Sequence, residues 1–231
     1  MISLTIPTMW AYPNFLDFLP KVLERESIGE VIIINNDVDK TPSNDILKHD
    51  KIKIHNCEEN IFVVPSWNLG ASLAKYPILG FLGDDVEVNV GVFDKVSEFI
   101  KPEMGMIGLL SSYFTEDYEK IYHKFLIDDS ITFSDPEDPD YTKRPPPCGI
   151  GNLFFVLKQN WLNIPNVKIF HGEIILWNKL SQTKKNYMIT NCSNQTPWNV
   201  TWKFLADNES NKFTTIQHED QKLAESMNFT F

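Results

Sequence analysis

The chain has 231 residues, of which 42% are hydrophobic and 13% aromatic, and its formal net charge at pH 7 is −10. This length favours one large α/β domain over two, and the hydrophobic content is sufficient for a substantial core. The acidic balance argues against non-specific attraction to nucleic acids or anionic membranes, and no apolar run approaches the roughly 20 residues of a membrane-spanning helix.

Strand and helix patterns alternate over residues 1–110. Short β-branched or apolar runs predict buried strands, and apolar residues at helical spacing predict helices between them. The expected strands cover residues 3–7, 30–34, 51–55, 77–82 and 106–110, and the expected helices cover residues 15–23, 66–74 and 92–100. Ser66 is expected to cap the second of these helices. The alternation predicts an α/β fold with a mostly parallel, doubly wound central sheet, helices on its faces and right-handed crossovers.

The pattern loosens after Leu110. Prolines between residues 135 and 147 are incompatible with helices and central strands, so we expect residues 112–148 to be irregular or edge structure of the kind that forms a lid or binding loop. The later expected elements are a strand over 149–157, a helix over 171–180 and a final helix near 219–227. No repeat or linker divides the chain, and we therefore expect a single domain over residues 1–231.

The cysteines and the N-terminus bear on the compartment. Cys57, Cys148 and Cys192 are scattered and lack the spacing of a metal site, which is typical of reduced thiols. Residues 1–7 lack the basic region and the long apolar stretch of a signal peptide and are expected to form the first strand. Both observations favour a cytoplasmic protein.

Two adjacent carboxylates, Asp84 and Asp85, directly follow the expected strand over residues 77–82. In parallel α/β sheets, ligands bind beyond the carboxyl ends of the strands, where this pair falls. Neighbouring carboxylates are costly to ionise together unless a cation neutralises them, and such oxygen ligands suit Mg²⁺ or Mn²⁺, which in turn suit phosphates. The alternative for the pair alone is an acidic turn or a helix cap.

Four short motifs occur in order over most of residues 1–180: Leu4–Thr8 at the first strand, Asn35–Asp37 after the second, Trp67–Gly70 before the Asp84–Asp85 strand, and His171–Glu173 at a later helix start. Together with the order of elements, these motifs resemble the GT-A fold glycosyltransferases, particularly the family-2-like enzymes and the stand-alone viral and phage nucleotide-sugar transferases. The usual metal motif of this family is Asp-x-Asp, and here Gly83 stands at its first position. The resemblance implies a Rossmann-like sheet in which residues 1–110 bind the nucleotide sugar and residues 111–231 form the acceptor side. A viral member would work in the host cytoplasm.

The resemblance also implies a donor site and a metal site. The implied donor-binding residues are Thr5, Pro7, Thr8, Asn36, Asp37, Asn68 and Asp84. The first three would border the nucleotide base, Asp37 would bind the base or the ribose, and Asp84 would hold the ribose. Asp85 would coordinate Mn²⁺ or Mg²⁺, which stabilises charge on the departing diphosphate. A plain strand-to-helix turn for Pro7–Thr8 and simple helix packing for Asn68 stay open as alternatives.

Three further sites complete these expectations. Glu173 is the expected general base of a transfer that inverts the configuration of the sugar. The alternative is an acidic residue that stabilises the helix N-terminus through the helix dipole. If Glu173 is too far from the acceptor, retention of the sugar configuration stays open. His218 is a candidate metal ligand, or else a surface or capping residue. Trp198 and Trp202, in a polar segment, are candidates for stacking against the acceptor.

The leading hypothesis is a metal-dependent hexosyl- or pentosyltransferase that moves a sugar from a nucleoside diphosphate sugar, expected to be a UDP sugar, to a hydroxyl acceptor with inversion. The acceptor could be a glycan, a small molecule or a hydroxymethylated base of phage DNA, although the acidic charge opposes DNA. One rival is a nucleotidyltransferase, whose Gly-rich loop with Arg and Lys is missing from Ile6–Tyr12. Another is a non-catalytic sugar-nucleotide-binding protein. We expect no membrane insertion, and no pattern indicates an oligomeric state.

Overall fold

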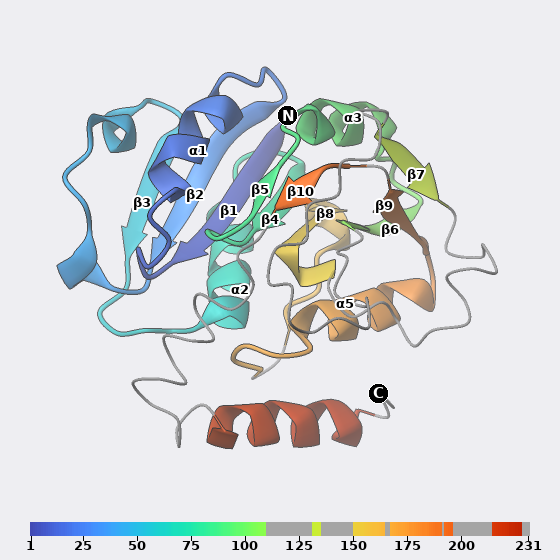
Figure 1. Ribbon diagram of the computed structural model, residues 1–231. Helices are drawn as coiled ribbons and strands as arrows, with labels where there is room; N and C mark the ends of the chain where they lie inside the picture. Colours follow the sequence, from blue (N-terminus) through green and yellow to red (C-terminus); the bar gives the residue numbers. More distant parts are fainter. Residues whose placement is uncertain (110–130, 135–149, 165–166, 191, 196–213, 228–231) are drawn as a thin grey trace.

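The computed structural model describes residues 1–109, 131–134, 150–164, 167–190, 192–195 and 214–227. An eight-stranded sheet in the order β3-β2-β1-β4-β8-β6-β9-β7 forms the centre of the molecule (Figure 1). Its strands are β1 (Ile2–Thr8), β2 (Ile28–Asn35), β3 (Ile52–Asn56), β4 (Ile78–Leu82), β6 (Met104–Leu109), β7 (Thr132–Ser134), β8 (Leu153–Leu157) and β9 (Lys185–Thr190). A separate antiparallel ribbon pairs β5 (Glu87–Val88) with β10 (Asn194–Gln195).

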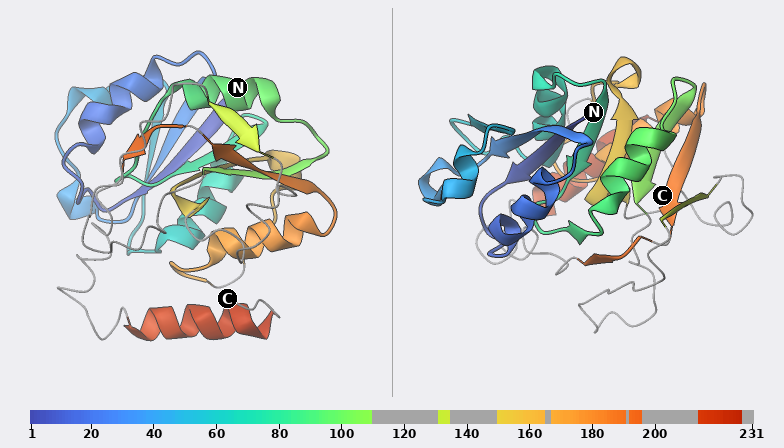
Figure 2. Two further views of the ribbon diagram at one scale, coloured as in Figure 1. Left: turned by 45° about the vertical axis from the view of Figure 1, so that its right-hand side comes forward. Right: turned by 90° about the horizontal axis from the view of Figure 1, so that it is seen from above.

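Helices cover both faces of this sheet, so the described chain is a three-layer α/β structure (Figures 1 and 2). The helices are α1 (Phe15–Leu23), α2 (Val63–Leu73), α3 (Gly91–Phe99), α5 (Gly172–Ser181) and a C-terminal helix over residues 214–226. Apolar residues of α1 and α3 share one buried cluster with Ile2, Leu4 and Ile6 of β1. Residues of α2, α5 and the C-terminal helix share the cluster on the opposite face.

Strand direction follows the expectation in the first half and departs from it in the second. Strands β3, β2, β1 and β4 are parallel, as the alternating pattern predicts. Strand β8, however, runs antiparallel to both of its neighbours, β4 and β6, and β7 runs antiparallel to β9. The apolar pattern of a strand reports its burial on both faces and carries no information on its direction. The mixture of parallel and antiparallel strand pairs is therefore seen only in the structure.

The start of α2 corrects the sequence-based expectation. The helix begins at Val63, with Phe62 before it at a φ of 67°, so Ser66 lies inside the helix and does not cap it. The Ser66 hydroxyl donates to the Phe62 carbonyl oxygen and accepts from Asn36 Nδ2. Pro65 sits in the first turn, where a missing backbone N–H does no harm. The sequence-based expectation places the start too late because Ser66 is a residue type that favours helix N-caps.

Later elements were partly predicted. Most of residues 112–148 lie outside the described residues, and the part that is described forms the edge strand β7. Strand β9 was not predicted, because its polar positions Lys185, Asn186 and Thr190 mask the apolar pattern. The C-terminal helix is already helical at residue 214, ahead of the predicted start near 219. No helix in the described part of the chain is both long and apolar enough to cross a membrane.

Candidate functional site

A pocket that is open to solvent lies at the edge of the sheet where β1, β2 and β4 end. Its wall combines the ends of these strands with the segment before α2 and the loop before α5. The lining residues are Pro7, Thr8, Met9, Asn36, Asn60, Phe62, Val63, Asp84 and Ile169. Four residues predicted for donor binding, Pro7, Thr8, Asn36 and Asp84, therefore meet in one pocket although they come from three strands. The carboxyl ends of parallel strands form such a crevice in this sheet type.

Thr8 connects the end of β1 to the acidic pair beyond β4. Its hydroxyl donates to Asp84 Oδ2 at 2.6 Å and accepts from the backbone N–H of Trp10 at 2.8 Å. Trp10 adopts a left-handed backbone conformation with a φ of 57°. The turn after β1 is thus folded against the Asp84 carboxylate, which fixes one side of the pocket.

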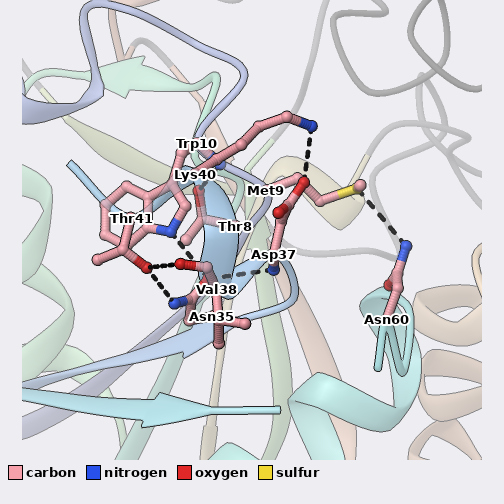
Figure 3. A network of polar contacts seen from close by, with 9 residues as sticks. All are labelled: Thr8, Met9, Trp10, Asn35, Asp37, Val38, Lys40, Thr41 and Asn60. Atoms are coloured by element: carbon pink, nitrogen blue, oxygen red, sulfur yellow. Dashed lines mark hydrogen bonds and ion pairs between the residues drawn. The ribbon is translucent and has the colours of Figure 1, made fainter. Parts of the chain in front are cut away.

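Asn35, at the end of β2, organises the polar network drawn in Figure 3. Its Oδ1 accepts from Trp10 Nε1 at 2.8 Å and from the backbone N–H of Asp37 at 3.1 Å. Its Nδ2 donates to Thr41 Oγ1 and to Asn56 Oδ1, so both the oxygen and the nitrogen of this fully buried amide are hydrogen-bonded. Asp37 pairs with Lys40 at 2.6 Å and is not among the pocket-lining residues.

The carboxylates of Asp84 and Asp85 are held in an environment that disfavours their ionised forms. Burial, and then the charge of Asp85, raise the pKa of Asp84 to about 7, while burial raises the pKa of Asp85 to about 6. Gly83 stands at the first position of the Asp-x-Asp motif, and a Cβ on this residue would lie 3.0 Å from Asp85 Oδ1 and 3.0 Å from Val86 Cγ2. A larger residue at position 83 would therefore require these two side chains to shift slightly.

The chemistry of this pair fits a hard divalent cation. Two adjacent carboxylates that resist joint ionisation are stabilised when a metal ion neutralises them, and Mg²⁺-type ions commonly bind through one or two carboxylates completed by substrate phosphates. Within the described ranges, no group of three or more His, Cys, Asp or Glu side chains is arranged to hold a metal ion by itself.

Glu173 stands in the first turn of α5, after His171, which caps the helix in the left-handed conformation at a φ of 64°. Burial raises the pKa of Glu173 to about 7, the range suited to a general base at neutral pH. The side chain packs over Gly151, where an added Cβ would lie 3.2 Å from Glu173 Cδ. The neighbouring Asn152 carbonyl accepts from the N–H of Gly83 at 3.0 Å. One short segment, Gly151–Asn152, therefore touches both Glu173 and the start of the acidic turn.

Two predicted donor residues have packing roles here. Thr5 is 1% exposed in the middle of β1 and faces Gly70 of α2, at which a Cβ would lie 2.3 Å from Thr5 Cγ2. Asn68 exchanges two hydrogen bonds with the backbone of Ile164, which occupy its Oδ1 and Nδ2. Neither residue lines the pocket. The glycine permits the close approach of α2 to the sheet, and the asparagine ties α2 to the segment after β8.

His218, the other predicted metal ligand, does not line the pocket. His218 is exposed on the C-terminal helix and belongs to no metal-binding group among the residues with described positions. Trp198 and Trp202 lie outside the described residues. Sequence reasoning missed five pocket residues, because four of them are apolar and only the fold brings them together: Met9, Asn60, Phe62, Val63 and Ile169.

Glu173 gives a testable pH dependence of stability. Its pKa is about 7 in the folded protein and near the ordinary 4.5 when unfolded, so between these values the folded state binds more protons and stability falls as pH rises. Glu173→Gln does not titrate, and its stability relative to wild type should therefore grow by about 2 kcal/mol from pH 4.5 to 7.5, after allowance for the partial exposure of the side chain. Urea unfolding across this pH range measures the difference.

The matched control is Glu98→Gln, which removes an exposed glutamate from helix α3 and should show no such pH-dependent difference. A constant stability difference between Glu173→Gln and wild type would contradict the raised pKa.

Comparison with known proteins identifies the fold. No protein-family model matches the chain, and no curated protein matches it in sequence. Residues 1–349 of Staphylococcus aureus TarS match with a TM-score of 0.56 and 12% identity over 97% of this chain and 72% of that one. The TarS 1–349 complex with UDP-GlcNAc matches with a TM-score of 0.55 and 11% identity over 84% of this chain and 57% of that one.

A second glycosyltransferase gives the same result. The structure of GalNAc-T7 with UDP, GalNAc and Mn²⁺ matches with a TM-score of 0.55 and 15% identity over 84% of this chain. The match covers 43% of the GalNAc-T7 chain, so this chain spans less than half of that relative and little more than half of TarS in its UDP-GlcNAc complex. At such identities the likeness is one of fold. The chain has the Rossmann-like GT-A fold of these glycosyltransferases.

Proposed function

We propose that this protein is a metal-dependent glycosyltransferase that moves a sugar from a nucleoside diphosphate sugar to a hydroxyl acceptor. The observation that carries the proposal is the meeting of Pro7, Thr8, Asn36 and Asp84 in one pocket, with Asp85 next in the chain. The fold supports it, since the solved structures of this fold include complexes with UDP-GlcNAc and with UDP and Mn²⁺. UDP is accordingly the nucleotide we propose.

The pocket residues divide between the parts of the donor. Pro7, Thr8 and Asn36 border the base and ribose, and Asp84 accepts from a ribose hydroxyl. Thr8 supports this role because its hydrogen bond fixes the direction of the Asp84 carboxylate. Asp85 would hold Mn²⁺ or Mg²⁺, and the bound ion would supply Lewis-acid stabilisation of the charge on the leaving diphosphate.

Glu173 takes the proton of the acceptor hydroxyl in this proposal. A carboxylate with a pKa of about 7 is partly ionised at neutral pH and still basic enough to accept a proton as the new bond forms. Glu173 packs against Gly151, and the adjacent Asn152 carbonyl binds the start of the acidic turn, so one segment connects the proposed base to the proposed metal site. In this proposal the base acts from the side opposite the leaving group. The sugar centre would then be inverted.

A thermal-shift screen of UDP, GDP and their sugars, each with Mn²⁺ or with EDTA, tests the proposal. A ligand at 100 times its dissociation constant stabilises the folded state by about 2.7 kcal/mol, which corresponds to a rise in Tm of about 5–10 °C for a chain of this size. We expect such a rise for one nucleotide family with Mn²⁺ and a much smaller one with EDTA. Release of UDP or GDP from that sugar donor, measured over glycan, small-molecule and hydroxymethylated-DNA acceptors, then distinguishes a transferase from a binding protein. Absence of any shift would contradict the proposal.

A further inference from the structure

A buried carboxylate from the C-terminal helix binds the loop that precedes α5. Asp220 is 1% exposed, and its Oδ1 accepts from the backbone N–H of Lys168 at 2.9 Å. Its Oδ2 accepts from the N–H of Ile169 at 2.8 Å and from that of Phe170 at 3.0 Å. Three consecutive backbone N–H groups therefore point at one carboxylate, in the manner of a backbone anion nest.

The position of Asp220 on its helix is unusual for a charged residue. Ile216 and Ala224, one turn before and one turn after it, are buried at 3% and 0% exposure, so Asp220 occupies the middle of the apolar stripe by which the helix docks. A charge placed there has a large desolvation cost, which only strong hydrogen bonds offset. An apolar residue would avoid that cost but would remove the acceptor of the three N–H groups at residues 168–170, so the aspartate serves this loop as well as the docking of the helix.

The bound loop belongs to the candidate site. Ile169 lines the pocket, and His171 and Glu173 follow it into α5. The carbonyl of Lys168 accepts from the N–H of Val64 at 2.9 Å, which connects the loop to the pocket wall at the start of α2. Through one carboxylate, the C-terminal helix thus fixes a loop that supplies a wall of the pocket and the approach to the candidate base.

We infer that Asp220 is a positioning residue of the proposed transferase, whose carboxylate holds the 168–170 backbone and through it the helix start that carries Glu173. This inference rests on the proposed function. Asp220 contacts backbone groups of the loop and acts on the reaction through the placement of Glu173, where a displacement of about 1 Å can cost about a hundredfold in rate.

The test compares Asp220→Asn with wild type, well below both melting temperatures. The asparagine amide presents an N–H₂ group to at least one of the three N–H donors, so the nest cannot be satisfied. We expect a 10- to 100-fold loss of kcat, with the dissociation constant for UDP and Mn²⁺ changed less than threefold, because Thr8, Asn36 and Asp84 stand on other elements. Amide hydrogen exchange at residues 168–170 should become faster. Asp220→Glu, which keeps a carboxylate, should recover part of kcat.

Glu225→Gln on the exposed face of the same helix is the control and should leave kcat and exchange within twofold of wild type. A folded Asp220→Asn with wild-type kcat, or with unchanged exchange at residues 168–170, would overturn the positioning role alone. Failure of both Asp220 variants to fold would also overturn it, because the carboxylate would then be a requirement of the fold. A wild-type protein without donor hydrolysis or transfer would overturn the proposed function and this role together.

Discussion

Asp85→Asn is expected to lower sugar transfer by about a thousandfold while leaving the protein folded. The substitution removes the charge proposed to hold the divalent ion, and the leaving diphosphate then loses Lewis-acid stabilisation worth several kcal/mol, of which each 1.4 kcal/mol is about a factor of ten in rate. The carboxylate has a raised pKa, so its replacement by a neutral amide should not destabilise the metal-free fold. Steady-state release of the nucleoside diphosphate at saturating Mn²⁺ measures the loss.

Two comparisons separate a metal effect from a general one. Asp50→Asn removes an exposed aspartate that lies just before β3 and is not among the pocket-lining residues, and it should leave the rate within twofold of wild type. The concentration of Mn²⁺ that gives half-maximal activity should rise sharply in Asp85→Asn and not in the control. A rate of Asp85→Asn in EDTA equal to that of wild type with Mn²⁺ would contradict the metal-dependent mechanism.

Glu173→Gln should reduce kcat by about 10²- to 10⁴-fold, the range associated with loss of a general base. Donor affinity should stay within threefold of wild type, since the pocket residues around the donor are unchanged. In wild type, kcat/KM should rise with pH through about 7, because the base must be ionised and burial raises its pKa to that value. The residual activity of Glu173→Gln should lack this rise.

The expected gain in stability of Glu173→Gln at neutral pH makes this result easy to interpret, because lost activity cannot then be ascribed to unfolding. Glu98→Gln again serves as the control for removal of a glutamate. The anomeric configuration of the product, read by NMR, should be inverted. A kcat near that of wild type in Glu173→Gln, or a product with retained configuration, would rule out Glu173 as the base of an inverting transfer.

The first half of the fold was predictable because its information is local. Strands β1, β2 and β4 are short apolar runs followed by turn-forming residues, and β3 is a weaker alternating pattern. The four strands are parallel, as the strand–helix alternation indicates. Asp84 was predicted from its place directly after a buried strand, whereas Thr8 and Asn36 were implied by the family resemblance. The fold places all three in one pocket, because parallel strands bring their carboxyl ends together.

The parts that sequence could not supply depend on contacts distant along the chain. Asn68 has the composition of a ligand-binding residue, yet its amide is used by Ile164, 96 residues later. Asn35 and Asn36 are neighbours in one polar cluster, and only the fold shows that Asn35 is a buried organiser while Asn36 reaches the pocket. Asp220 reads as a surface aspartate in a polar tail until its partners at 168–170 are seen.

The central claim is that the Asp84–Asp85 end of β4 binds a divalent ion together with a nucleoside diphosphate. Isothermal titration of UDP and of GDP into wild type and Asp85→Asn, each with Mn²⁺ and with EDTA, tests it most directly. The account predicts that the tighter nucleotide binds wild type with Mn²⁺ at least about tenfold more strongly than with EDTA, a difference of about 1.4 kcal/mol, and that Asp85→Asn abolishes this gain. Equal affinities of that nucleotide for wild type and Asp85→Asn, with Mn²⁺ and with EDTA, would contradict it.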